Sequence, residues 1–205
     1  MNVINLAGTV FLDPIIENEY NREKFYKFFI DVPRYSGTVD RVPCVISEKL
    51  INKIKENKQI EVSGNVKSFN YHDDDGKFHL DLKVFVREVF DFTEYKNDFS
   101  GNIHICKKPF SRITSKGRRI ADVMAASNRS TSYKCDYIPC IFWGRDAKKV
   151  ARLDVGTGLE LNGRFQSRKY IKNFDDGTSV EKTAYEISID DFKEWKDESK
   201  NNNGV

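Results

Sequence analysis

One internal duplication constrains the fold of this chain more than any other feature of its sequence. Residues 42–46 (VPCVI) recur as residues 138–142 (IPCIF), and residues 62–66 (VSGNV) recur as residues 161–165 (LNGRF). Both copies then continue with a Ser, a Tyr three residues later and an Asp-Gly pair. Four matches in the same order indicate that the 205 residues hold two copies of one structural unit.

Each copy is predicted to form three strands, a short helix and two further strands. In the first copy, the helix follows Ser47 as its N-cap at 48–55, and the expected strands are 2–10, 24–32, 40–46, 59–69 and 77–90. In the second copy, a helix is expected near 145–152, with strands near 102–106, 119–128, 136–143, 158–170 and 179–190. This order within about 95 residues is that of the OB fold, a five-stranded Greek-key barrel.

The predicted fold class is therefore all-β, with two tandem OB folds that each carry one short helix. We place the first domain at 1–95, a linker at 96–101, the second domain at 102–195 and a disordered tail at 196–205. The acidic segments 73–76 and 175–177 are interpreted as the tips of the last hairpin of each domain, since Asp-Gly favours a tight turn. Such tips could also chelate a cation, although acidic residues are ordinary in turns.

Composition and spacing argue against several classes of protein. No apolar run approaches the roughly 18 residues of a membrane helix, and the first ten residues lack the features of a signal peptide. The four Cys and three His lack zinc-site spacing, so we expect no metal and no cofactor, and we interpret Cys44 and Cys140 as buried thiols. No catalytic triad or phosphate-binding loop is present, and no enzymatic activity is expected.

Charge is distributed unequally between the two copies. Residues 1–95 carry 13 Lys or Arg against 16 Asp or Glu, a net charge of −3, whereas residues 96–205 carry 21 against 15, a net charge of +6. Phosphate groups are attracted by clustered positive charge. Only the second copy therefore has a clear electrostatic reason to attract a nucleic acid.

The second copy also carries a family resemblance, in the segments DYIPCIFWGR, LNGRFQSRKY and DDG of residues 136–177. These segments resemble the core of bacterial single-stranded-DNA-binding proteins, less closely before Asp122, and the first copy resembles that family more distantly through NVINLAGTV. The resemblance implies binding of single strands without strong sequence preference, in replication, recombination or repair. It further implies particles of four barrels, which a homodimer of this chain would supply, and a cytoplasmic, nucleoid-associated location.

Single strands are held by aromatic faces that stack on bases and by cations that contact phosphates. By resemblance, Trp143, Tyr137 and Tyr170 stand at the base-stacking positions of the family, although packing is the alternative role for Trp143. Period-two alternation places Tyr137 with Trp143 on one face, and Arg164, Arg168 and Tyr170 on one face of the next strand. That basic strip could instead be a solvated surface. Further candidate contacts in this copy are Arg129, Arg145, Lys169, Lys172 and Phe174.

The first copy departs from this pattern. Ser47 stands in the place of Trp143, and Arg41 in the place of Tyr137, which leaves Tyr71, Arg34 and Lys67 as its candidate contacts. Its other aromatic residues are expected in the core or at an interface, namely Phe25, Phe28, Phe29, Phe85 and Phe90. We expect this copy to bind weakly or to mediate dimerisation.

Two other functions stay open at this point. Proteins of the resembled family end in an acidic run closing with Pro-Phe, whereas this sequence ends SKNNNGV, so recruitment of proteins through that tip is not expected. The missing tip and the acidic first copy favour an OB-fold interaction module, such as a primosome-like accessory factor with incidental DNA contact. Single-stranded RNA is the other alternative ligand, since OB folds take either kind of strand.

Overall fold

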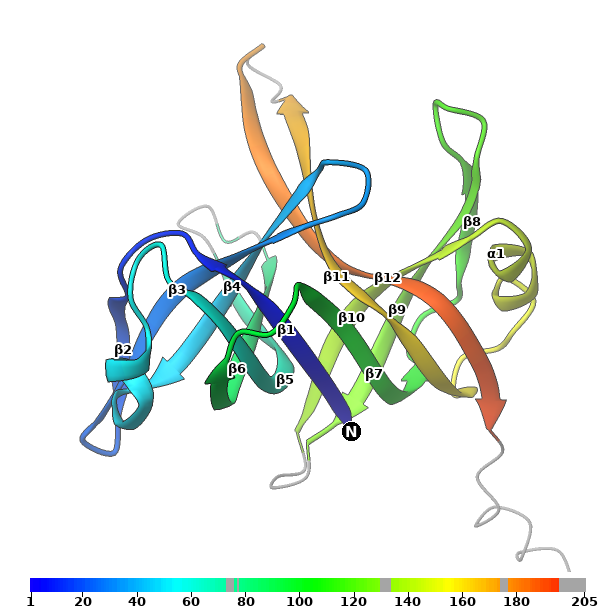
Figure 1. Cartoon of the computed structure of the whole chain (residues 1–205). Helices are drawn as coiled ribbons and strands as arrows, with labels where there is room; N and C mark the ends of the chain where they lie inside the picture. The colour runs from blue at the N-terminus through cyan, green and yellow to red at the C-terminus, as the bar shows by residue number, and fades with distance from the viewer. Residues whose placement is uncertain (73–75, 77, 130–133, 174–176, 196–205) are drawn as a thin grey trace, which may run out of the picture. The chain divides into compact units, whose positions relative to one another are not determined.

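The computed structural model describes residues 1–72, 76, 78–129, 134–173 and 177–195 (Figure 1). The elements of the first copy are β1 (Asn2–Val10), β2 (Ile15–Tyr20), β3 (Glu23–Pro33), β4 (Val39–Ser47), η1 (Glu48–Lys53), β5 (Gln59–His72) and β6 (Phe78–Asp91). Those of the second copy are β7 (Lys96–Ile105), β8 (Phe110–Ile113), β9 (Arg119–Asn128), β10 (Cys135–Trp143), α1 (Gly144–Val150), β11 (Gly158–Asn173) and β12 (Ser179–Trp195). The all-β prediction is confirmed, and β2 and β8 are strands that the sequence analysis did not predict.

The chain divides into two compact units that do not follow the two copies residue by residue. The N-terminal unit comprises Val3–Asp98 and Phe165–Glu186, and the C-terminal unit comprises Met1–Asn2, Phe99–Arg164 and Ile187–Val205. The outer part of the β11–β12 hairpin thus groups with the first copy. The domain limits 1–95 and 102–195 stay predictions about the sequence copies.

Residues 96–101 were expected to form a linker, but they form the first part of β7. Burial alternates along this strand, with Phe99, Gly101, Ile103 and Ile105 facing inward. The apolar residues at 103 and 105 indicated a strand that starts near 102. The alternation of inward and outward residues begins earlier, because Phe99 and the small Gly101 already occupy inward positions.

Both copies share one strand topology. In the first, the strand order is β2-β3-β4-β6-β5-β1, with β1 also pairing with β3. In the second, the order is β8-β9-β10-β12-β11-β7, with β7 also pairing with β9. Each copy contains one parallel pair, which joins Cys44 to Val84 in the first and Cys140 to Ile187 in the second. The extra pairing closes each sheet, and the result is the predicted OB fold.

The repeated sequence motifs are explained by close packing. Cys44 and Cys140 are buried among the core residues of β4 and β10, as predicted. At Gly64 a Cβ atom would lie 2.3 Å from the carbonyl oxygen of Phe85, and at Gly163 it would lie 2.2 Å from that of Ser188. The duplicated glycine is therefore required because a neighbouring strand passes too close for any side chain.

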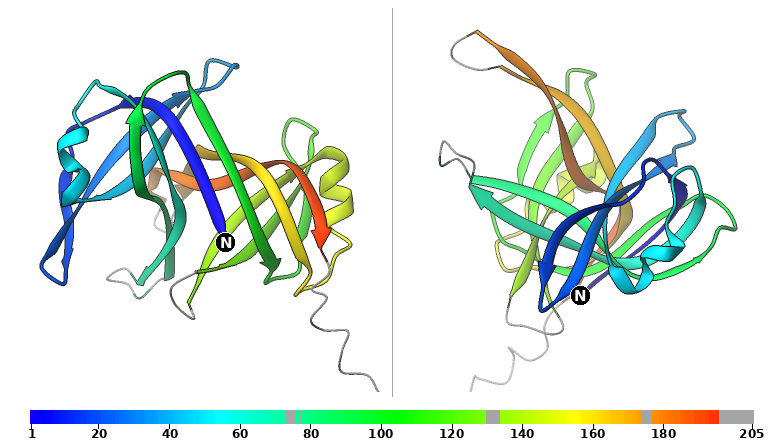
Figure 2. Two further views of the ribbon diagram at one scale, coloured as in Figure 1. Left: turned by 60° about the horizontal axis from the view of Figure 1, so that its bottom comes forward. Right: turned by 90° about the vertical axis from the view of Figure 1, so that its left-hand side faces the viewer.

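The two helical segments follow β4 and β10, as the views in Figures 1 and 2 show. Ser47 caps η1 as predicted, since its Oγ accepts a hydrogen bond from the backbone N–H of Lys49 at 3.2 Å. However, η1 is a 3₁₀ segment that ends at Lys53 rather than an α-helix that reaches 55. Its C-cap residue Ile54 is buried and has extended backbone, which ends the helical turn.

Several expectations fall on positions outside the described residues. These are the acidic hairpin tips 73–75 and 175–176 and the tail 196–205. Over the part of the chain that is described, no helix combines the length and apolar character needed to cross a membrane.

Candidate nucleic-acid interface

Tyr137 and Trp143 lie on the outer face of β10, in the C-terminal unit. Residues 138, 140 and 142 point into the core, and Tyr137 and Trp143 have the opposite parity, with 41% and 36% of their surface exposed. The predicted shared face is therefore present. Ile141 has the same parity but is only 5% exposed, so it forms an apolar floor between exposed rings.

The position of the Trp143 ring is fixed at its edge. Its Nε1–H donates a hydrogen bond to the Oγ of Ser188 on β12 at 2.9 Å. Gly144 follows with φ +55°, a left-handed conformation that glycine adopts without strain, and α1 begins there. This turn leaves Arg145 exposed next to the ring. An aromatic side chain held by its edge keeps ring surface available for stacking.

Arg129 and Arg34, both predicted DNA contacts, are engaged in equivalent ion pairs. Arg129 binds both carboxylate oxygens of Asp136, at 3.0 and 2.6 Å, and Arg34 binds both oxygens of Asp40. Hydrogen bonding to these acids raises the pKa of each guanidinium above its ordinary value. The Arg–Asp pair is thus part of the duplication, and it was visible in the sequence as an acid six or seven residues after each arginine.

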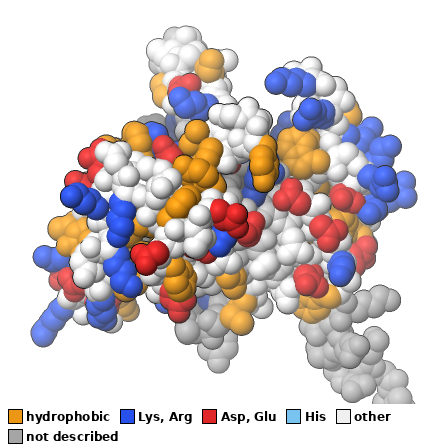
Figure 3. Space-filling view, viewed as in Figure 1, with side chains coloured by type: hydrophobic (Ala, Val, Ile, Leu, Met, Phe, Trp, Pro, Cys, Tyr) orange, Lys and Arg blue, Asp and Glu red, His pale blue; other side chains and the backbone are white. Residues whose placement is uncertain are grey.

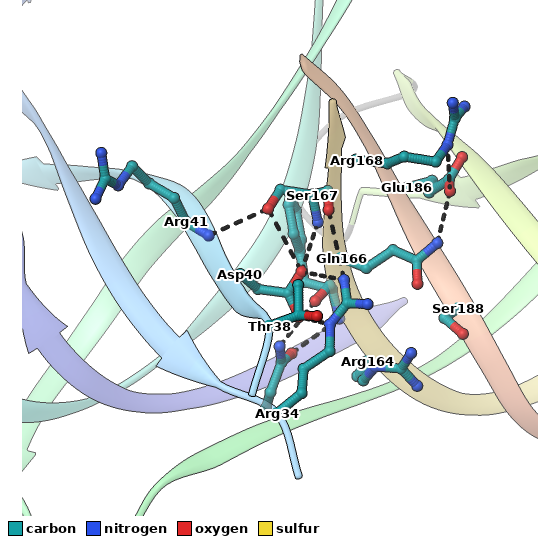
Figure 4. Close-up of polar contacts among 12 residues, drawn as sticks. Arg34, Thr38, Asp40, Arg41, Arg164, Gln166, Ser167, Arg168, Glu186 and Ser188 are labelled. Carbon is teal, nitrogen blue, oxygen red and sulfur yellow. Dashed lines mark hydrogen bonds and ion pairs between the residues drawn. The ribbon is translucent and has the colours of Figure 1, made fainter. Parts of the chain in front are cut away.

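In the N-terminal unit, Asp40 is the centre of a buried network (Figure 4). Besides Arg34, its Oδ1 accepts hydrogen bonds from the backbone N–H of Ser167 at 2.8 Å and from the Ser167 hydroxyl at 3.4 Å. The backbone N–H of Arg41 donates to the same hydroxyl at 3.2 Å. These contacts tie β4 to the outer part of β11, and they give Ser167 a structural role.

The predicted basic strip on β11 is largely neutralised. Arg168 lies 3.6 Å from the carboxylate of Glu186, which also accepts a hydrogen bond from buried Gln166 at 2.6 Å (Figure 4). In the C-terminal unit, Arg164 lies 3.6 Å from Asp190. The predicted alternation of Arg and Tyr along β11 is present. The sequence did not indicate, however, that acids of β12 lie beside these arginines.

The remaining candidates of the hairpin have varied surroundings. Tyr170 is 38% exposed, and the Arg168 guanidinium lies 5.8 Å from its ring centroid. Lys169 is exposed and forms an ion pair with Glu181 at 2.8 Å. Lys172 is partly buried, and Phe174 lies outside the described residues.

The outer face of the first copy carries its own rings and cations, which differ from those of the second. Lys67 on β5 lies 4.0 Å from the ring centroid of Phe85, and Arg87 on β6 lies 4.8 Å from it. The ring centroids of Phe25 and Phe85 are 5.7 Å apart. Tyr71 is 53% exposed and stacks on the ring of His79. Cation and ring are thus paired within the protein.

Of the five phenylalanines of the first copy that were expected in the core or at an interface, Phe28 lies in the core, with 1% of its surface exposed. Phe25, Phe29 and Phe85 are partly exposed, and Phe90 is 47% exposed. For Phe25, Phe29 and Phe85 the reason is strand parity, because odd-numbered residues of β3 and of the first part of β6 point outward. Phe90 follows a register shift in the pairing of β5 with β6 between Ser63 and Gly64. Arg41, which replaces Tyr137, pairs with Asp31 through two contacts of 2.8 Å.

No metal centre is found in the described residues, where no group of three or more His, Cys, Asp or Glu side chains is placed to hold an ion. Exposed rings and exposed cations lie on strand faces, which suits a flexible anionic chain.

Comparisons with known proteins agree with this geometry. Residues 101–194 match the model of the Single-strand binding protein family. The structure is similar to the wild-type single-stranded DNA binding protein from Thermus aquaticus, with a TM-score of 0.75 and 13% identity over 96% of this chain and 93% of that chain. A deletion mutant of the Thermus aquaticus protein gives 0.73 and 14%, over 96% and 95%.

These structural likenesses, at such low identity, bear on the fold alone and agree with two OB folds in tandem. Among curated proteins, no sequence matches the chain. The family match is confined to the second sequence copy, which carries Trp143, Tyr137 and the duplicated motifs. Residues 101–194 are thus similar to the single-strand binding protein family, and the chain as a whole folds as two OB folds in one polypeptide.

Proposed function

We propose that this chain binds single-stranded DNA, largely without sequence preference, through the outer face of β10 in the C-terminal unit. The observation that carries the proposal is Trp143, which is 36% exposed and held at its edge by Ser188. Tyr137 shares its face, and Arg145 is exposed beside it. Rings with free faces stack on any base, which accounts for binding without sequence preference.

The match of residues 101–194 to the single-strand binding protein family and the net charge of +6 on residues 96–205 support the same ligand. We further propose that the chain acts as a homodimer in replication, recombination or repair, because the resembled family works with four barrels. Arg129, Arg34 and Arg168 are weaker candidates for direct phosphate contacts, because each forms an ion pair with an acid of the protein.

Tryptophan fluorescence tests the proposal, since Trp143 and Trp195 are the two tryptophans of the chain. Oligo-dT at low salt is expected to quench the emission of the wild type, and Trp143→Phe is expected to lose most of that response. Trp195→Phe is the matched control, because the Trp195 ring packs against Gly158 of β11 and the ring of His104 of β7, so its replacement should preserve the quench.

Two results would contradict the proposal. One is an unchanged emission together with a failure of oligo-dT to co-migrate with the protein. The other is oligo-U that displaces oligo-dT at lower concentration than oligo-dT itself, which would assign the face to RNA.

A further inference from the structure

Ser188, which is labelled in Figure 4, is an outward-facing residue of β12 that is nevertheless buried. Its chain neighbours Ile187 and Ile189 point into the core and are 0% and 5% exposed, so Ser188 points to the opposite side of the strand. It pairs with Ile141, which has the same parity as Trp143 on β10. A residue on this face that is only 1% exposed is covered by another side chain, and the hydrogen bond identifies that side chain as Trp143.

The hydrogen bond between Trp143 and Ser188 uses the only polar group of the Trp143 ring. An indole ring has one N–H, which donates a hydrogen bond and does not accept one. It donates to the Ser188 Oγ at 2.9 Å, an ordinary length for a hydrogen bond. What the ring offers to a ligand is therefore apolar surface, and 36% of the residue is exposed.

The backbone on both sides of Ser188 holds its hydroxyl in place. On one side, β12 pairs with β10 through Ser188 and Ile141. On the other side, β11 passes so close that a Cβ atom at Gly163 would lie 2.2 Å from the Ser188 carbonyl oxygen. A serine held in this way loses little conformational freedom when it orients another side chain. Its position therefore fixes the edge of the Trp143 ring.

The first copy shows that the OB fold does not itself require a serine at this position. Phe85 on β6 is the equivalent residue, because Phe85 and Ser188 take the same place in the parallel strand pair of each copy. In the first copy the residue in the place of Trp143 is Ser47, whose Oγ caps η1. A barrel without the tryptophan thus carries no serine opposite it. The serine is matched to the Trp143 ring and not to the barrel.

The positive charge of the C-terminal unit attracts phosphates, which are the same in every nucleotide. Blue side chains gather over the β8–β9 hairpin in Figure 3, where Lys116, Arg118 and Arg119 are exposed. Contacts between cations and phosphates carry no sequence information. A preference for one base then depends on the polar edges of the side chains that stack on the bases.

A free indole N–H would distinguish between bases. Stacking on a ring face is tolerated by every base. A donor that reaches the edge of a base is selective, because thymine has the carbonyl O4 where cytosine has the amino group N4. An unoccupied Trp143 N–H would therefore favour thymine over cytosine. In the structure, Ser188 withholds this donor from a ligand.

We infer that Ser188 is the positioning residue of Trp143 and that it keeps the binding face from preferring one base over another. It holds the ring by its edge, with ring surface available for stacking, and it occupies the one group of the ring that could select a base. The inference rests on the proposed function, because it assigns the lack of sequence preference of that same face to one side chain.

The test compares the affinities of the full chain for labelled oligo-dT and oligo-dC of about 16 nucleotides, the upper range for one OB fold. Ser188→Ala removes the acceptor and frees the indole N–H. The ratio of the two affinities is expected to shift toward oligo-dT by about 2- to 13-fold, the effect of one hydrogen bond. A residue that only stabilised the barrel would change both affinities by the same factor.

The same substitution in a chain without the indole N–H shows whether Ser188 acts through Trp143. Trp143→Phe keeps an aromatic ring and removes the donor. In this background, Ser188→Ala should leave the ratio of the oligo-dT and oligo-dC affinities unchanged.

Ser127→Ala is the matched control. It removes another buried hydroxyl of the C-terminal unit, which accepts a hydrogen bond from the Asn2 side chain at 3.2 Å. This variant should keep the wild-type ratio of affinities, because its hydroxyl does not bond the Trp143 ring. Circular dichroism checks that each variant is folded.

Hydrogen exchange in the wild type gives a second measurement that needs no change at Ser188. The indole N–H signal of Trp143 in an NMR spectrum is assigned by its loss in Trp143→Phe. It is expected to exchange slowly with solvent both in the free protein and with oligo-dT bound, because it stays bonded to a buried hydroxyl. Faster exchange on binding would show that the ligand releases the N–H, and the inference would be wrong.

The outcomes separate the inference from the proposed function. If the wild type neither binds oligo-dT nor changes its emission, the proposed function fails and the inference fails with it. If the wild type binds but Ser188→Ala keeps the wild-type ratio of affinities, the inference alone is overturned. An equal shift of the ratio in the Trp143→Phe background overturns it as well, because Ser188 would then act without the indole N–H.

Discussion

Trp143 in the C-terminal unit and Phe85 in the N-terminal unit are aromatic side chains on equivalent faces, held in opposite ways. Phe85 on β6 pairs with Val45, and Ser188 on β12 pairs with Ile141, so Phe85 and Ser188 occupy equivalent positions in the two copies. The exposed ring is therefore on the last strand in the first copy, whereas in the second copy a serine stands there and the ring is on β10. The Trp143 ring is held by its edge, whereas two cations lie over the Phe85 ring.

A cation over a ring occupies the face on which a base would stack. The second copy therefore holds the Trp143 ring by its edge, whereas the first copy covers the Phe85 ring with two of its own cations. Duplication preserved the barrel and its aromatic content, and the partners of each ring decide which copy offers a binding surface.

The largest expected effect is on stability, and it concerns the Arg–Asp ion pair that both copies contain. Asp40→Ala and Asp136→Ala each leave a partly buried arginine without its carboxylate, and each should lower the free energy of unfolding by about 3–5 kcal/mol. Urea unfolding followed by circular dichroism measures this. Exposed Asp154→Ala is the control, with a change below about 1 kcal/mol. A loss confined to one of the two copies would show that the pairs are not equivalent.

The second prediction separates the copies. Trp143→Ala should weaken oligo-dT binding about 5- to 150-fold, because a free stacking platform is lost. Phe85→Ala should change affinity less than about twofold, since its ring faces are already covered by Lys67 and Arg87. Fluorescence anisotropy on folded variants gives both values. Equal losses would mean that the first copy stacks bases as well.

The smallest expected effect tests whether the ion pair with Glu186 keeps Arg168 on β11 from contributing to DNA binding. Glu186→Gln removes the carboxylate beside Arg168 and keeps a side chain of the same shape next to Gln166. Freed Arg168 should strengthen oligo-dT binding by about 1.5- to 5-fold, the range of one surface ion pair, and steepen the salt slope by about 0.7. The double variant Glu186→Gln, Arg168→Gln should cancel the gain; if it does not, Arg168 is not the source.

Most elements could be predicted because they bury one face. The period-two runs of β1, β3, β4, β9 and β10 matched the structure to within one residue at each end. β2 and β8 were missed because nearly all of their residues are exposed, so their sequences carry no alternation of polar and apolar side chains. Their existence depends on pairing with β3 and β9 at the edge of each sheet.

For the candidate site, the sequence placed Tyr137 and Trp143 on one face, because parity along a strand is a local property. It did not place Glu186 beside Arg168, or Asp190 beside Arg164, because those acids come from another strand whose register a single sequence leaves open. The cations of residues 107–119 were counted in the total charge, but nothing local showed that Arg112 shares a face with Trp143 through the register of β8, β9 and β10.

The sequence by itself determined the duplication, the strand order of each copy and the inward and outward sides of the strands, since all of these follow from repetition and period-two burial. Only the tertiary structure decided which charges are free. Asp40, Asp136 and Glu186 lie next to arginines for which the sequence alone indicated no partner. The physical reason is that Coulomb and stacking interactions act over a few ångströms in space, between strands distant in sequence.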